Sequence, residues 1–301
     1  AAAYANAEKL LPPTYQVGKT YVFDVSQDME MDMAEVGTAL GQPGLEKTVV
    51  KMNIEMTAGC AAGEGKQKLV TSEPSRVFLD INTGGIQMAY DSEEPGSENS
   101  MLGPELSKLK GRKMTMTLDE NGEVVEVEGL EDVAAAGPAG QMLGPDQLKQ
   151  MINPAMQLGI PMEGVEIGDT WKNRVKMSLG GQVGTMEINF DLKYVRDEDV
   201  DGVSCAVVEY QANVDLEAEA DGGAANPIEV KVENSEMSGE MKLDKDLRFF
   251  RIGVTKMDMV TSMGNPLNPE QTFEIPVKLT QTYKLKSAEE TPEKESADES
   301  N

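Results

Sequence analysis

The amino-acid sequence predicts an all-β protein made of two related antiparallel sheets or half-barrels, packed together or in tandem, with one or two short bridging helices. Three observations support this prediction. Apolar and polar residues alternate along most of the chain, tight-turn sequences separate the alternating runs, and helix-like spacing of apolar residues is scarce. Alternation with a period of two is typical of a strand with one face against a core and the other in water.

The alternation is clearest near the N-terminus. Residues 21–33 (YVFDVSQDMEMDM) place Tyr21, Phe23 and Val25 on one face, and methionines continue the series. Residues 48–56 (TVVKMNIEM) repeat the pattern. Successive side chains of a strand point to opposite faces, so each run predicts one apolar face. The further strands that we expect lie at residues 69–70 with 76–81, 112–118, 123–128, 171–179, 184–195, 203–216, 227–234, 236–243, 247–256 and 274–286.

Turn sequences separate these runs. Residues 119–122 (DENG) lie between two alternating runs, and Asn-Gly is favoured in hairpin turns because both residues tolerate positive φ. Asp201-Gly202 occupies the corresponding place between two later runs. Both sequences therefore predict hairpins, which are the connections expected in an antiparallel sheet.

Helical patterns are confined to two short stretches. The sequence MLGP at residues 101–104 precedes residues 105–110, and the same sequence at residues 142–145 precedes residues 146–158. Proline is tolerated in the first turn of a helix, and the acidic residues that follow it are favourable there. We expect Pro154 to kink or end the second helix.

The two halves of the chain carry similar motifs in the same order. Residues 17–21 (VGKTY) resemble residues 167–171 (IGDTW), and residues 114–119 (MTMTLD) resemble residues 238–244 (SGEMKLD). We interpret this order as a tandem duplication, and the alternative is convergent hairpin chemistry. The expected organisation is a flexible N-terminus at residues 1–10, a first β repeat at 11–132, a linker with a short helix at 133–166, a second β repeat at 167–286, and a disordered acidic tail at 287–301.

The same motifs resemble a family of uncharacterised bacterial exported all-β proteins that carry two such β halves. In that family a central proline-valine stretch leads to Gly-Asp-x-Trp, as residues 161–171 do here, and an upstream Asp-x-x-Gly hairpin matches Asp119 to Gly122. The resemblance spans most of residues 13–286. It implies export and an all-β fold, and it brings no catalytic residues because the family has no established activity.

The composition excludes several classes of function. The chain has 53 acidic and 27 basic residues, and its net charge of −26 disfavours nucleic acid and anionic membranes as partners. Histidine is absent, which removes the commonest general base, the usual catalytic triads and most zinc or copper sites. Carboxylates are abundant, but no aromatic platform for a sugar accompanies a pair of them. We therefore expect a protein that is not an enzyme.

The cellular location is predicted from two features. No apolar stretch approaches the roughly 20 residues of a transmembrane helix. The chain begins AAAYANA, and small residues of this kind often surround a signal-peptidase site. We expect an extracytoplasmic protein of the periplasm, the outer envelope or the secreted fraction.

One acidic motif is a candidate calcium site. Asp197, Asp199 and Asp201, followed by Gly202, match the first half of a calcium-binding loop, whose ligands alternate along the chain. The position of the closing bidentate acid is occupied by Val208. Calcium is therefore one interpretation, and a solvated acidic hairpin is the other.

The sulfur-containing residues leave further alternatives open. Cys60 and Cys205 either form a disulfide between the halves or are two buried thiols. Methionines recur at every second position, as in residues 29–33, which suits core packing better than copper binding because no histidine supports a copper site. A methionine-lined apolar pocket between the sheets is the intermediate interpretation.

These features favour two functions. The first is a non-catalytic binding or carrier protein of the cell envelope for an apolar or peptide ligand. The second is a structural or interaction component of the envelope or cell surface, with its acidic groups neutralised by cations. A carboxylate-dependent hydrolase is a third class, and the sequence leaves the oligomeric state open.

Overall fold

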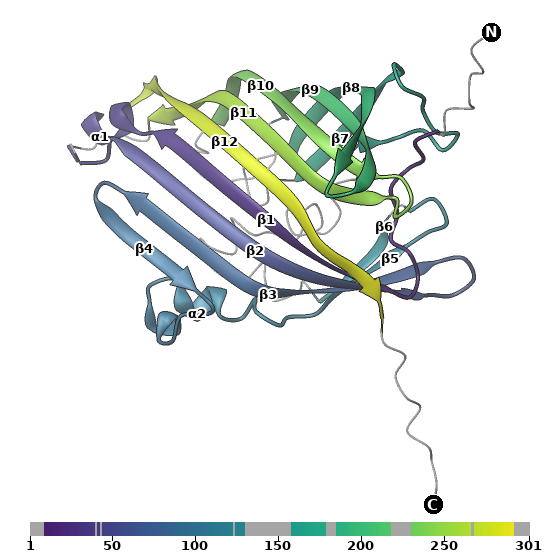
Figure 1. Ribbon diagram of the computed structural model, residues 1–301. Helices are drawn as coiled ribbons and strands as arrows, with labels where there is room; N and C mark the ends of the chain where they lie inside the picture. Colours follow the sequence, from purple (N-terminus) through teal and green to yellow (C-terminus); the bar gives the residue numbers. More distant parts are fainter. Residues whose placement is uncertain are drawn as a thin grey trace, which may run out of the picture.

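The computed structural model describes residues 9–39, 41–42, 44–122, 124–129, 158–178, 185–217, 230–265 and 268–291. It is dominated by long strands (Figure 1). The strands are β1 (Lys19–Asp32), β2 (Lys47–Ala62), β3 (Lys68–Thr83), β4 (Ile86–Asp91), β5 (Met114–Leu118), β6 (Val124–Glu128), β7 (Thr170–Ser178), β8 (Thr185–Val200), β9 (Val203–Glu217), β10 (Val230–Asp244), β11 (Phe249–Asn265) and β12 (Asn268–Glu290). The helices are α1 (Ala34–Ala39), α2 (Gly103–Leu106) and the 3-10 turn η1 (Ser97–Asn99).

All twelve strands belong to one curved antiparallel sheet. Its order is β6-β5-β3-β2-β1-β12-β11-β10-β9-β8-β7, and β4 pairs with β3 beside that path. The first six strands form one half of the sheet and the last six form the other. The halves join where β1 pairs with β12, from Lys19 opposite Glu290 to Met31 opposite Val277. The predicted all-β antiparallel class is confirmed, and the two expected sheets are fused into one because their first and last strands pair; the duplication stays a prediction.

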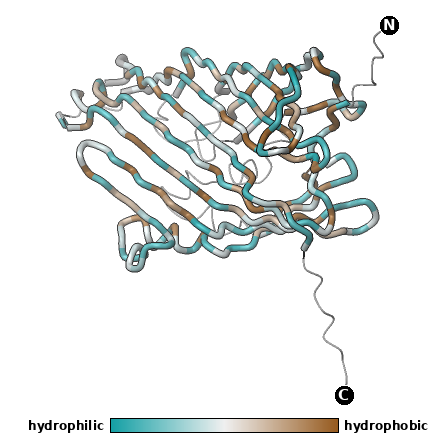
Figure 2. The backbone as a smooth tube through the Cα atoms, viewed as in Figure 1, coloured by the Kyte–Doolittle hydropathy of each residue, from teal (hydrophilic) through white to brown (hydrophobic). Residues whose placement is uncertain are grey.

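Alternating burial along the strands gives the sheet two different faces. In β1, Tyr21, Phe23 and Val25 are fully buried, whereas Val22 and Asp24 between them are partly exposed. Figure 2 shows the same alternation of hydrophobic and hydrophilic residues along the strands. We call the face that carries Tyr21, Phe23 and Val25 the inner face, and the opposite one the outer face.

The predicted hairpin turns are present. Gly122 has φ 85° between β5 and β6, and Asp201 and Gly202 have φ 53° and 81° between β8 and β9. The side chain of Asp119 accepts a hydrogen bond from the backbone N–H of Asn121 at 2.9 Å, which fixes the first of these turns. Positive φ is readily accessible to Gly and is tolerated by Asp, so Gly122, Asp201 and Gly202 suit the positions that they occupy.

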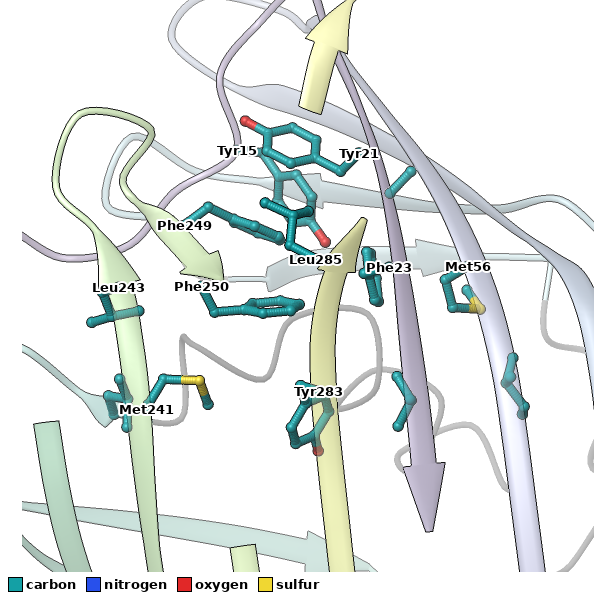
Figure 3. Close-up of a cluster of buried hydrophobic side chains, with 14 of the residues drawn as sticks. Tyr15, Tyr21, Phe23, Met56, Met241, Leu243, Phe249, Phe250, Tyr283 and Leu285 are labelled. Carbon is teal, nitrogen blue, oxygen red and sulfur yellow. The ribbon is translucent and has the colours of Figure 1, made fainter. Parts of the chain in front are cut away.

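The joint between the halves is filled by aromatic side chains of the inner face (Figure 3). Tyr21 lies 5.0 Å from Tyr15 and 4.6 Å from Phe249, measured between ring centroids. Phe250 stacks on Phe249 at 4.5 Å and meets Phe23 edge to face at 5.5 Å. All five rings are fully buried. Aromatic side chains from β1, from β11 and from the segment that precedes β1 therefore fill this end of the inner face.

The helices differ from the sequence prediction in part. Residues 103–106 form α2 with Pro104 in its first turn, so the predicted proline start is confirmed, but the helix ends sooner than expected. The short helix α1 was not predicted; the side chain of Asp32 accepts a hydrogen bond from the N–H of Ala34 at 3.1 Å and caps it. The helix predicted at residues 146–158 lies outside the described residues, apart from Leu158.

Both termini of the described chain are more ordered than the sequence predicts. Leu10, placed in a flexible N-terminus, is buried and pairs with Val165. Residues 287–290, placed in a disordered tail, continue β12 alongside β1, and Glu290 lies 3.1 Å from the ammonium of Lys19. Backbone pairing with β1 supplies order that the local composition does not reveal.

Candidate functional site

The inner face divides into a filled part and an accessible part. Beyond the aromatic joint, six apolar inward residues of the central strands are partly exposed, among buried neighbours such as Val50, Met257 and Val277. The six are Met29 and Met31 in β1, Met52 in β2, Met237 in β10, Met259 in β11 and Leu279 in β12. We call these six residues the methionine surface. They pack against the buried core on one side and remain partly accessible on the other.

The members of the methionine surface are neighbours across strands. Met29 lies opposite Leu279, which lies opposite Met257, and Met257 in turn lies opposite Met237. At the next inward position, two residues further along each strand, Val277 lies between Met31 and Met259. Directly opposite side chains on one face of a sheet are about 5 Å apart. These residues therefore form one apolar cluster over β1, β12, β11 and β10, in which the linking residues Met257 and Val277 are buried.

A row of polar residues separates the methionine surface from the aromatic joint. Gln27 in β1 lies opposite Gln281 in β12, and Gln281 lies opposite Thr255 in β11. The hydroxyl of Thr255 is 2.5 Å from the hydroxyl of Tyr210, whose ring passes over Gly239. Both glutamines are half-exposed. The sequence analysis overlooked them, although Gln27 interrupts the apolar series Tyr21, Phe23, Val25, Met29 at an inward position.

The outer face carries a groove of about 870 Å³ that crosses β7 to β11. Its charges balance within the groove and its immediate surroundings. Asp191 lies 2.8 Å from the ammonium of Lys172, and Arg196 contacts Glu209 at 3.3 Å and Glu240 at 3.2 Å. The lining combines charged and polar side chains with the apolar side chains of Trp171, Leu192 and Val254. The lining residues are Thr170, Trp171, Lys172, Asp191, Leu192, Lys193, Glu209, Tyr210, Gln211, Ser238, Gly239, Glu240, Val254 and Lys256.

The three aspartates of the candidate calcium loop are not brought together. Asp197 lies in β8, 2.8 Å from the ammonium of Lys245, and accepts a hydrogen bond from the hydroxyl of Tyr194. Asp199 accepts a hydrogen bond from the N–H of Gly202 at 3.0 Å, and Asp201 occupies the turn. In the part of the chain that the structure describes, no group of three His, Cys, Asp or Glu side chains is placed to hold a metal ion. The acidic motif serves the hairpin instead.

Electrostatics at Asp197 agree with this assignment. Burial alone would raise the pKa of the Asp197 carboxyl, but the hydrogen bonds from Lys245 and Tyr194 lower it below its ordinary value. The carboxylate is thus held in its charged form by a protein cation, and calcium binding at this loop stays a prediction.

The two cysteines lie far apart in the sheet. Cys60 is in β2 and Cys205 in β9, with β1, β12, β11 and β10 between them, and both are buried free thiols. A disulfide needs Cα atoms within about 7 Å, whereas neighbouring strands alone are roughly 4.8 Å apart. The disulfide alternative is therefore wrong for this structure. Burial raises the pKa of both thiols, and burial together with the negative charge of Asp244 raises that of Cys205 to about 11.

Several outer-face carboxyl groups are held ionised by neighbouring cations. Hydrogen bonds from cationic side chains are the largest cause of a lowered pKa at three of them. The pairs are Glu55 with Lys286, Asp91 with Arg76 and Glu198 with Lys242. A general acid needs the opposite shift, so these three groups are unsuited to donating a proton near neutral pH.

The helices of the described residues lack the length and hydropathy required to cross a bilayer. The arrangement as a whole defines an antiparallel β-sheet protein with a charged outer face and a partly accessible apolar inner face. The chain belongs to DUF6263, a family of unknown function, whose model matches residues 66–247. Membership in a family of unknown function with a mainly β structure is as the sequence resemblance predicted; a bacterial, exported origin stays a prediction.

Comparisons with other proteins give distant similarities. No curated protein has a sequence that matches this chain. Among solved structures, lipovitellin, described for its lipid–protein interactions, is similar over 94% of this chain at 10% identity and a TM-score of 0.48, and the chain spans only 27% of that protein. A Bacteroides fragilis protein with a YmcC-like fold has 12% identity and a TM-score of 0.28, with 93% and 99% of the two chains covered. A DUF1329 family protein from Desulfovibrio piger has 8% identity and a TM-score of 0.24, with 93% and 88% covered.

Proposed function

We propose that this protein is a non-catalytic binding or carrier protein for an apolar ligand, which lies over the methionine surface. The observation that carries the proposal is the partial exposure of six neighbouring apolar side chains on the face that holds the core. Apolar area left in water costs roughly 25 cal/mol per Å², and contiguous apolar patches mark interaction sites.

The chemistry of the surface favours a flexible apolar ligand. Methionine is unbranched and polarisable, so a methionine-lined surface adapts to partners of different shape. An adaptable apolar surface suits a hydrocarbon chain better than a ligand of fixed polar shape.

The absence of catalysis and an extracytoplasmic location are parts of the same proposal. The non-catalytic role rests on the absence of histidine from the sequence, and the lowered pKa values of Glu55, Asp91 and Glu198 make only these three groups unsuited to act as general acids near neutral pH. The location rests on the sequence resemblance to exported proteins, and fractionation of cells that produce the protein natively would test it.

The alternative function, an interaction component of the envelope, is favoured by one observation. Among the described strands, β6 lies at one end of the sheet, and its Val124 and Val125 are 42% and 60% exposed. An unpaired edge strand with exposed apolar residues can pair with another chain. This alternative predicts self-association in place of ligand binding.

The double variant M29Q/M259Q tests the binding proposal. Glutamine keeps the length of methionine but adds a polar amide, so we expect the affinity for the neutral apolar dye Nile red to fall about tenfold, as a loss of roughly 1.4 kcal/mol implies. Fluorescence titration measures the dissociation constant, and size-exclusion chromatography with light scattering reports the oligomeric state.

The matched control is Lys51→Gln, an exposed position on the outer face of β2. It should bind the dye as the unmodified protein does. Equal dye affinity in the double variant and the unmodified protein would refute binding at the methionine surface. A protein that binds no dye but forms dimers would favour the interaction function.

A further inference from the structure

Two side-chain amides of the inner face form no hydrogen bond with the described residues of the protein. Gln27 and Gln281 lie directly opposite each other on β1 and β12, and both are half-exposed. In the part of the chain that the structure describes, neither side-chain amide has a hydrogen-bond partner, and they do not bond each other. Each amide offers two donors and one acceptor oxygen.

Several other polar groups of the inner face are satisfied, whereas Ser72 in β3 is buried without a hydrogen-bond partner among the described residues. Tyr210 and Thr255 share a hydrogen bond of 2.5 Å, and Thr48 and Thr83 share one of 2.7 Å. The two glutamines are therefore the polar groups of the central row whose hydrogen-bonding capacity stays unused. An apolar ligand that covered these groups without bonding to them would leave them without partners, which is unfavourable.

The surroundings of the two amides are uncharged. Their inward neighbours along and across the strands are Val25, Met29, Met52, Thr255, Leu279 and Tyr283. A charged head group would find no ion-pair partner among these neighbours, and the net charge of −26 further disfavours an anion. A neutral polar group that both accepts and donates hydrogen bonds fits the amides.

We propose that Gln27 and Gln281 form a polar anchor for the head of a neutral acyl ester or amide, whose hydrocarbon chain lies along the methionine surface. This inference rests on the proposed function and specifies its ligand class. The amide N–H groups donate to the carbonyl of the ligand, and the amide oxygens accept from a hydroxyl or N–H of its head group. The chain then extends from the central row over Met29, Leu279 and Met237.

The double variant Q27M/Q281M tests the anchor. Methionine preserves side-chain length and matches the adjacent surface, so the fold is retained, which circular dichroism and the melting temperature verify. Displacement of Nile red by monooleoylglycerol and by 1-octadecene separates the two contributions. We expect the unmodified protein to prefer the ester about tenfold, and the variant to lose that preference because its ester binding weakens while its octadecene binding is at least as tight as before.

The matched control is Gln211→Met, the same substitution at an exposed outer-face position of β9. It should keep the preference for the ester. Unchanged ester affinity in Q27M/Q281M would overturn the anchor while leaving the methionine surface as a binding site. If neither competitor displaces the dye from the unmodified protein, both the proposed function and the anchor are refuted. Oleate, whose carboxylate is charged, should compete less well than the ester, and a stronger effect of oleate would contradict the ligand class.

Discussion

At the scale of single residues, the two cysteines are informative because their environments make them unreactive. Burial raises the pKa of Cys60, and burial with the nearby Asp244 raises that of Cys205 to about 11. The reactive thiolate is therefore scarce at pH 8. We expect iodoacetamide to label neither thiol in the native protein and both thiols in urea without reductant, as measured by intact mass spectrometry.

The urea sample contains its own control for the disulfide. A disulfide between Cys60 and Cys205 would block labelling in urea until a reductant is added. Rapid labelling of either thiol in the native protein would show that its surroundings are more open than the structure indicates. Both results are read from mass additions on one chain, so unfolding and bond formation are distinguished directly.

At the scale of secondary-structure elements, the pairing of β1 with β12 makes one sheet from two halves. Phe23 in β1 is fully buried and meets Phe250 of β11 at 5.5 Å. Truncation of a buried phenylalanine usually destabilises a protein by about 3–5 kcal/mol. We expect Phe23→Ala to lower the urea midpoint equally when it is followed by far-UV circular dichroism and by the fluorescence of Trp171, which lies in β7 of the other half.

The neighbouring substitution Val22→Ala is the control, because Val22 is half-exposed on the outer face and should cost less than about 1 kcal/mol. If the urea midpoint followed by Trp171 fluorescence is unchanged in Phe23→Ala, the two halves unfold independently. That result would support two separate domains, as the sequence alone suggests, over one cooperative sheet.

At the scale of the whole molecule, the net charge of −26 sets how stability responds to salt. Self-repulsion destabilises the compact state, and added ions screen it. We expect the melting temperature to rise by several degrees between low and high salt, measured by scanning calorimetry. Because Asp197 is held by Lys245 and Tyr194, CaCl₂ and MgCl₂ at equal concentration should raise it equally.

Calcium specificity would contradict this expectation. A larger rise in CaCl₂ than in MgCl₂, abolished by Asp201→Asn, would restore the calcium loop that residues 197–202 suggest in sequence. Asp201 is the suitable position for this variant because it occupies the turn. An equal response in the variant and the unmodified protein would mean that the acids act only through their summed charge.

The sequence determines by itself the local part of this structure. Alternation places Tyr21, Phe23 and Val25 on one face, and Asp119 to Gly122 and Asp201-Gly202 specify their turns through positive φ. The same alternation also places Gln27 inward, so half of the candidate anchor could have been found by noticing one polar residue in an apolar series. These features depend on neighbours within a few residues of each other, which is what a sequence pattern records.

Tertiary structure alone decided the long-range part. The pairing of β1 with β12 brings Gln27 beside Gln281, orders residues 287–290 and fuses two expected sheets into one. The strand order also separates Cys60 from Cys205 by four strands, and the fold places the ammonium of Lys245 2.8 Å from the carboxylate of Asp197. Strand partners are chosen by backbone hydrogen bonds and packing between residues that are distant in the chain, and no local pattern encodes which partner is taken.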